Sequence, residues 1–108
     1  MSELLKEIIR LAESGQLRIS EHGYDELADD GLSAREVVAG LMRGQVVEDY
    51  PDYPKGPCVL VLVEDHVGNP VHALWGIPKG HTSPAVLITA YRPAPGRWDK
   101  KFLKRIDS

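Results

Sequence analysis

Residues 85–93 read Ala-Val-Leu-Ile-Thr-Ala-Tyr-Arg-Pro, and this stretch decides the fold that the sequence predicts. The apolar run at 86–88 is typical of a central strand with both faces covered, and prolines bracket it on either side. Three polar side chains follow the run: Thr89, Tyr91 and Arg92. We therefore expect a buried central strand whose far end presents polar side chains to a ligand.

Helical patterns occupy the first half of the chain. Apolar residues at helical spacing predict a helix over 3–13, and Gly15 is suited to end it. Ser20 is an N-cap residue for a second helix over 21–29. Ser33 and Glu36 have the spacing of a capping box, which predicts the start of a third helix.

Strand patterns occupy the second half. Residues 46–47 begin it, the turn-rich segment 48–54 is expected to form a loop, and 58–63 is the next strand. A turn at 65–69 then leads back antiparallel along 71–77. Helices followed by a meander indicate the α+β class, with N-terminal helices packed on an antiparallel β-sheet in a single domain of residues 1–108.

Composition limits the classes of protein. The chain has 108 residues and a net charge of −3, and the acidic balance argues against broad nonspecific binding of nucleic acid. The one cysteine, Cys58, fits a reducing compartment. No apolar run reaches the length that spans a bilayer and the N-terminus lacks a signal-peptide pattern, so we expect a cytoplasmic protein with no membrane contact.

His22 is the histidine that the sequence singles out for chemistry. Asp25 and Glu26 follow it on the same predicted helix, and nearby carboxylates stabilise a cationic imidazole, which suits a general acid. The structural alternative is that His22 anchors its helix to the sheet by a hydrogen bond. A further alternative is a metal-dependent hydrolase in which His22 and carboxylates bind the ion.

Two other groups have similar alternatives. Tyr91 and Arg92 suit a phosphate clamp, or else are a strand-terminal aromatic and a solvated charge. Trp98 with Arg97 beside it suits stacking on a base while the cation holds a phosphate, or else Trp98 closes the core as a lid.

Several short motifs in order carry a resemblance to a family. They are Ile-Ser-Glu-His at 19–22, Gly-Leu-Ser-Ala-Arg-Glu-Val at 31–37, Gly-Gln-Val-Val-Glu-Asp-Tyr at 44–50, and Thr-Ala-Tyr-Arg-Pro at 89–93 with Trp98 behind it. Over about residues 17–98 the chain resembles the small bacterial family called domain of unknown function 4258.

The resemblance implies a fold similar to the RelE-type toxin ribonucleases and the MqsR-type toxin, whose partners include small zinc-finger antitoxins. By position it makes His22, Glu48, Tyr91 and Arg92 candidate catalytic residues for cleaving RNA without a metal or other cofactor. A base, an acid and a cation for the phosphate are the groups that such cleavage needs. The candidate substrate-binding residues are Thr89, Arg97 and Trp98.

The leading hypothesis is therefore a toxin-like domain of a bacterial toxin–antitoxin pair that acts as an endoribonuclease. The competing hypothesis is a non-enzymatic interaction module, in which a strand edge or the basic tail over 97–105 docks a partner protein.

Overall fold

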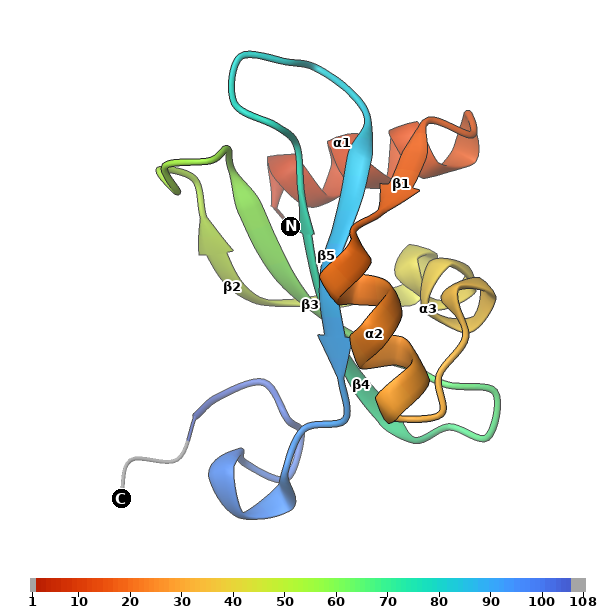
Figure 1. Cartoon of the computed structure of the whole chain (residues 1–108). Helices are drawn as coiled ribbons and strands as arrows, with labels where there is room; N and C mark the ends of the chain where they lie inside the picture. Colours follow the sequence, from red (N-terminus) through yellow and green to blue (C-terminus); the bar gives the residue numbers. More distant parts are fainter. Residues whose placement is uncertain (1, 106–108) are drawn as a thin grey trace.

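The computed structural model describes residues 2–105, which form three helices and a five-stranded sheet (Figure 1). The helices are α1 (Glu3–Glu13), α2 (Glu21–Asp29) and α3 (Ala34–Gly40), and short 3-10 turns follow at Leu41–Arg43 (η1) and Pro95–Arg97 (η2). The strands are β1 (Leu17–Ile19), β2 (Gln45–Tyr50), β3 (Cys58–Glu64), β4 (Pro70–Gly76) and β5 (Ala85–Tyr91). The predicted α+β class is confirmed. Within residues 2–105, no helix has the length and apolarity to cross a membrane.

The sheet has the strand order β1-β5-β4-β3-β2. Strands β2 to β5 form the predicted antiparallel meander, and the short β1 adds to its edge in parallel, with Leu17 opposite Ala85 and Ile19 opposite Leu87. The sheet is therefore mixed, because β1 runs parallel to β5 while the other neighbouring strands run antiparallel. Strands β1 and β2 are its two edges.

One face of the sheet carries the core. Alternate residues of β3, β4 and β5 point under the three helices, because successive side chains of a strand face opposite ways. Among them Val61, Ala73, Trp75 and Leu87 are completely buried, and Leu5, Ile8, Leu11 and Leu27 pack on them from α1 and α2. We call this the helix-covered face.

The N-caps of α2 and α3 are the serines that the sequence predicts. The Ser20 hydroxyl accepts a hydrogen bond from Gly23 N at 2.9 Å and donates one to the carbonyl of Ile88 at 2.8 Å, so the same side chain caps α2 and ties it to β5. The capping box of Ser33 and Glu36 is present at α3. Gly23 lets α2 approach closely, since a Cβ there would lie 2.9 Å from the carbonyl oxygen of Leu87.

The opposite face, which we call the open face, is covered in part by the C-terminal segment that follows Pro93. This segment passes through η2 and folds back on itself, with a β-bridge between Trp98 and Arg105. Figure 1 shows it in blue on the side of β5 away from α2 and α3. Val86 and Ile88 are only half-buried, so the expectation that both faces of β5 are covered is wrong at these positions.

The prediction of a loop over 48–54 is wrong for residues 48–50. Glu48, Asp49 and Tyr50 continue β2, because Leu60, Val59 and Cys58 of β3 pair with them. Pairing with a neighbouring strand outweighs the local turn preference of these residues, and the loop begins only at Pro51. A register shift between Val46 and Glu48 leaves Val47 as an extra residue in β2.

Candidate functional site

A pocket of about 250 Å³ lies on the open face. Its lining combines apolar side chains from the sheet with three tyrosines, a threonine and an arginine: Tyr50, Tyr53, Cys58, Leu60, Leu74, Ile88, Thr89, Tyr91 and Arg105. A bulge in β5 brings both Ile88 and Thr89 to this face, since the pairing shifts from Leu74–Thr89 to Trp75–Leu87. We call this site the open-face pocket.

His72 lies next to the pocket and is completely buried. Its Nε2 is 2.7 Å from the carbonyl oxygen of Phe102, which accepts hydrogen bonds only, so Nε2 carries the proton and donates. Nδ1 then accepts from the Tyr91 hydroxyl at 3.3 Å. Burial lowers the pKa of His72, so the ring is neutral and acts as an acceptor for Tyr91.

Tyr91 joins His72 to the pocket. Its ring meets the imidazole edge-on at a centroid distance of 5.4 Å, and it lines the pocket at the same time. Burial raises the pKa of Tyr91, the nearby charge of Arg105 opposes this rise, and that of Glu48 adds to it. The phenol therefore keeps its proton and is available as a donor at neutral pH.

Glu48 and Arg105 form an ion pair beside the pocket, with Nε 2.9 Å from Oε1. The second carboxylate oxygen of Glu48 accepts the Tyr50 hydroxyl at 2.8 Å. The hydrogen bond from Tyr50 lowers the pKa of Glu48, burial opposes it, and Arg105 reinforces it. Glu48 is thus ionised, while the Arg105 side chain is 60% exposed and also lies 4.9 Å over the ring of Trp98.

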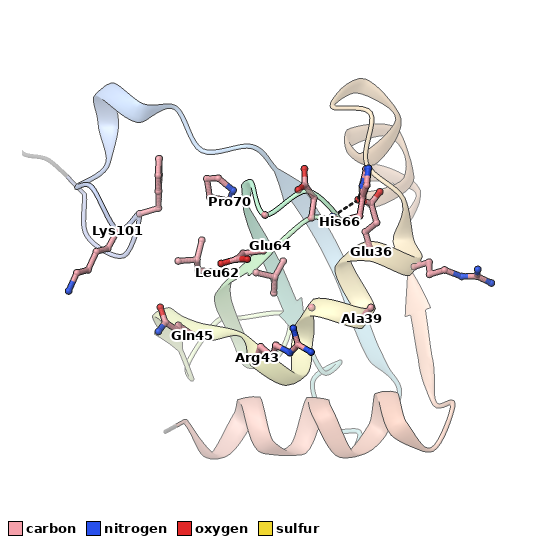
Figure 2. A pocket seen from close by; sticks show the side chains of 15 residues that line it. Glu36, Ala39, Arg43, Gln45, Leu62, Glu64, His66, Pro70 and Lys101 are labelled. Carbon is pink, nitrogen blue, oxygen red and sulfur yellow. Dashed lines mark hydrogen bonds and ion pairs between the residues drawn. The ribbon is translucent and has the colours of Figure 1, made fainter.

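A larger groove of about 970 Å³ lies between α3, the end of β3 with the turn that follows it, and residues 101–102 of the C-terminal segment (Figure 2). Charged residues of both signs line it, among them Arg35, Glu36, Arg43, Glu64, His66 and Lys101. Glu36 reaches across from α3 and bonds His66, with Oε2 2.5 Å from Nδ1 and 3.0 Å from the backbone N. The hydrogen bond to His66 is the main cause that lowers the pKa of Glu36 to about 2, and the same bond raises the pKa of His66.

Three of the predicted site residues lie at the open-face pocket. Thr89 and Tyr91 line it, and Glu48 bonds two residues that line it, Tyr50 and Arg105. They come together because the two β-bulges turn the polar ends of β2 and β5 to the same face.

His22 and Arg92 lie elsewhere. His22 is on α2, over the helix-covered face, and its side chain is 66% exposed with Nε2 3.5 Å from Glu26. Arg92 donates to Asp65 at 2.8 Å and to the backbone oxygen of Asp30 at 3.2 Å. Arg92 therefore joins the end of α2 to the β3–β4 turn, and the predicted set of four catalytic residues is divided between the two faces.

Arg97 and Trp98 lie in the C-terminal segment. Trp98 is 5% exposed, and its ring stands edge-on to His72 at 4.3 Å, which fits the lid alternative. Arg97 is exposed at the end of η2.

Sequence reasoning missed His72, Tyr50 and Arg105. The signal for His72 is a histidine in an apolar strand, at a position that alternates with the buried Ala73 and Trp75. Nothing local in the basic tail distinguishes Arg105 from the lysines around it. Within the part of the chain that the structure describes, no group of three or more His, Cys, Asp or Glu side chains is arranged to hold a metal ion.

Comparisons with known proteins give one match. The chain matches no curated protein and no solved structure. Likeness to the RelE fold therefore stays a prediction. A family described as Domain of unknown function (DUF4258) matches residues 19–92, against the expected 17–98, so the C-terminal segment with Trp98 and Arg105 lies beyond the matched region. This match spans well over half of the sequence, from β1 to the end of β5, and the chain belongs to the DUF4258 family.

Proposed function

We propose that this protein is the toxin-like member of a bacterial toxin–antitoxin pair and cleaves RNA in the cytoplasm at the open-face pocket, without a metal ion. The observation that carries the proposal is the grouping of an ionised carboxylate, a protonated phenol and a guanidinium at one pocket: Glu48, Tyr91 and Arg105. These are the three kinds of group that transfer of a phosphoryl group to a neighbouring hydroxyl requires.

The proposed step is an attack of the ribose 2′-oxygen on the adjacent phosphorus. Glu48 takes the 2′-hydroxyl proton as the O2′–P bond forms. The Tyr91 hydroxyl turns from His72 Nδ1 to the 5′-oxygen and gives its proton there as the P–O5′ bond breaks. Arg105 stabilises the negative charge that develops on the phosphoryl oxygens. The products are a 2′,3′-cyclic phosphate and a free 5′-hydroxyl, and the proton balance closes because one group gains the proton that the other loses.

Two features favour this arrangement over one centred on His22. His72 fixes the position of the Tyr91 side chain, and Tyr50 fixes that of Glu48. Fixed donors and acceptors are worth more to a transition state than mobile ones. His22, by contrast, is an exposed side chain on the other face.

The test is cleavage of a labelled single-stranded RNA by purified protein in excess chelator. We expect cyclic-phosphate ends from the wild type, and Tyr91→Phe, which removes only the hydroxyl, should lower the rate about 100-fold or more. The matched control is His22→Ala, which should cleave normally. Expression in growing bacteria should arrest growth in the same rank order. Intact RNA and normal growth with the wild type, or full activity of Tyr91→Phe, would refute the proposal.

The partner in this proposal is a small antitoxin of the zinc-finger kind. The exposed edge of β2 favours such a partner. Within residues 2–105, β2 pairs only with β3, so backbone groups on its other edge are free to pair with a strand of the antitoxin. Co-expression with the adjacent reading frame should restore growth and give a complex that copurifies.

A non-enzymatic interaction module is the second candidate, and the exposed edge of β2 with the basic C-terminal segment favours it. Under this alternative a partner binds wild type and Tyr91→Phe equally, and binding is lost when Arg97 and Lys101 are changed to Glu. RNA remains intact in both proteins.

A further inference from the structure

We infer that the open-face pocket holds a single unpaired nucleotide, with its base against the sheet and its phosphate on Arg105. This inference rests on the proposed function and names the substrate that the site accepts. It depends on the size, the lining and the charge of the pocket.

Size limits the occupant. Pockets for drug-sized ligands have roughly 300–1,000 Å³, and the open-face pocket has about 250 Å³. The occupant is therefore one ring system rather than an extended molecule. The open rim, which the loop residue Tyr53 borders with a half-exposed ring, lets the rest of a chain pass outside.

The lining favours a flat aromatic group. Leu60, Leu74 and Ile88 supply an apolar floor, and the rings of Tyr50, Tyr53 and Tyr91 surround it. Bases stack on aromatic side chains because every base has a π-face. The Thr89 hydroxyl, the one aliphatic hydroxyl in the lining, supplies a hydrogen-bonding group for the base edge.

The positive charge of Arg105 favours an occupant whose aromatic ring system carries a phosphate. Arg105 bonds Glu48 through Nε at 2.9 Å, and Tyr50 is a second hydrogen-bonding neighbour of its guanidinium. A guanidinium presents five N–H donors in a fork that matches phosphate oxygens, so Arg105 can hold Glu48 and a phosphate at once. The exposure of this side chain keeps it accessible.

The acidic balance of the chain limits the contact to about one phosphate. The net charge is −3, and among residues 2–105 Arg105 is the only basic residue in the lining of this pocket. A long basic channel for RNA is therefore absent at the pocket, and recognition is local. The salt dependence should be correspondingly shallow, with a slope of log K against log salt near about −0.7, the value for one phosphate on a single strand.

The experiment measures binding of the four nucleoside monophosphates and the matching nucleosides by calorimetry, which requires no cleavage. We expect at least one nucleotide to bind and its nucleoside to bind roughly tenfold more weakly or worse. Arg105→Gln should remove that difference. The matched control is Arg43→Gln, the same charge change in the other groove, which should leave binding unchanged.

A second variant tests the base site separately. Leu74 is half-buried on the pocket floor, so Leu74→Trp should fill the pocket and abolish binding of nucleotides and nucleosides alike. A thermal melt that matches the wild type checks the fold of each variant.

The outcomes separate the two proposals. Nucleotide binding that needs Arg105, with RNA left intact, supports the pocket and refutes cleavage. RNA cleavage that both pocket variants retain refutes the nucleotide pocket and shows that cleavage takes place away from the open-face pocket. Equal binding of an aromatic carboxylate such as N-acetylphenylalanine, or no binding of any nucleotide, overturns the inference.

Discussion

The imidazole of His72 donates a hydrogen bond from Nε2 to the carbonyl of Phe102 at 2.7 Å, across 30 residues of sequence. This bond fastens the C-terminal segment to the middle of the sheet. Phe102 has φ of 59°, a left-handed conformation that disfavours a non-glycine residue by about 1–2 kcal/mol. The contact with His72 stabilises this unusual backbone, and so keeps Trp98 and Arg105 at the site.

His72→Ala should lower the free energy of unfolding by about 2–4 kcal/mol, since it opens a cavity and leaves the Phe102 carbonyl and the Tyr91 hydroxyl without their partner. Urea denaturation measures the effect. The matched control is His81→Ala, which removes an exposed histidine and should stay within about 0.5 kcal/mol of wild type. Equal stability of the two variants would contradict the anchoring role of His72.

The Glu36–His66 pair should make stability depend on pH. The folded pKa of His66 is raised above 6.5, so its contribution is complete below pH 6.5 and is lost as pH rises through the raised value. The folded pKa of Glu36 is about 2 against 4.5, so its contribution is present above pH 4.5 and is lost as pH falls toward 2. Both contributions are present between pH 4.5 and 6.5.

The measurement is the urea midpoint from pH 3 to 9 for wild type and His66→Ala. We expect the variant to lose most in the window where both groups are charged and to converge with wild type at high pH. A constant difference across the whole range would show that the ion pair contributes nothing.

Gly23→Ala should destabilise the protein by about 1–3 kcal/mol, although alanine favours helices. The added Cβ would lie 2.9 Å from the backbone oxygen of Leu87 and push α2 away from β5. Gly96→Ala is the matched control, because its Cβ meets nothing within 4 Å. Thermal melts of both variants measure the change in stability. A Gly23→Ala protein more stable than wild type would mean that α2 lies farther from β5 than the structure shows.

Arg92→Ala should destabilise the protein at neutral pH and have less effect in acid. Burial raises the pKa of Asp65, but hydrogen bonds from the Asn69 and Val67 amides and from Arg92 outweigh it and hold the pKa at about 2. The contribution of Asp65 is therefore present above pH 3.8 and is lost as pH falls toward 2.

Without Arg92 the Asp65 pKa should rise toward its ordinary value, so the variant should be less stable than wild type above pH 3.8 and should converge with it as pH falls toward 2. Acid titration followed by circular dichroism checks this, and Arg92→Lys should recover part of the effect. RNA cleavage by Arg92→Ala at neutral pH, under conditions where it is folded, should match wild type, whereas Arg105→Gln should be impaired.

Much of the candidate site was within reach of sequence reasoning, and the rest was not. Tyr91, Thr89 and Glu48 were identified from the ends of strand patterns and from a family motif, and they do lie at one pocket. The carboxylates close to His22 in the sequence made it a candidate catalytic residue. They do not show against which face of the sheet its helix packs. Arg105 reaches the pocket because the C-terminal segment folds back on itself, and no periodic pattern in the sequence predicts this fold-back.

The sequence by itself determined the local features: three helices, the serine caps of α2 and α3, the alternation of β4 that buries Ala73 and Trp75, and the order of the helices before the strands β2 to β5. These depend on interactions between residues close in the chain. Only the tertiary structure decided the faces of β2 and β5. In a regular strand Val46 and Glu48 would share a face, as would Leu87 and Thr89, but one extra residue in each strand moves the polar partner to the open face. A bulge is fixed by pairing with the neighbouring strand, which local patterns do not encode.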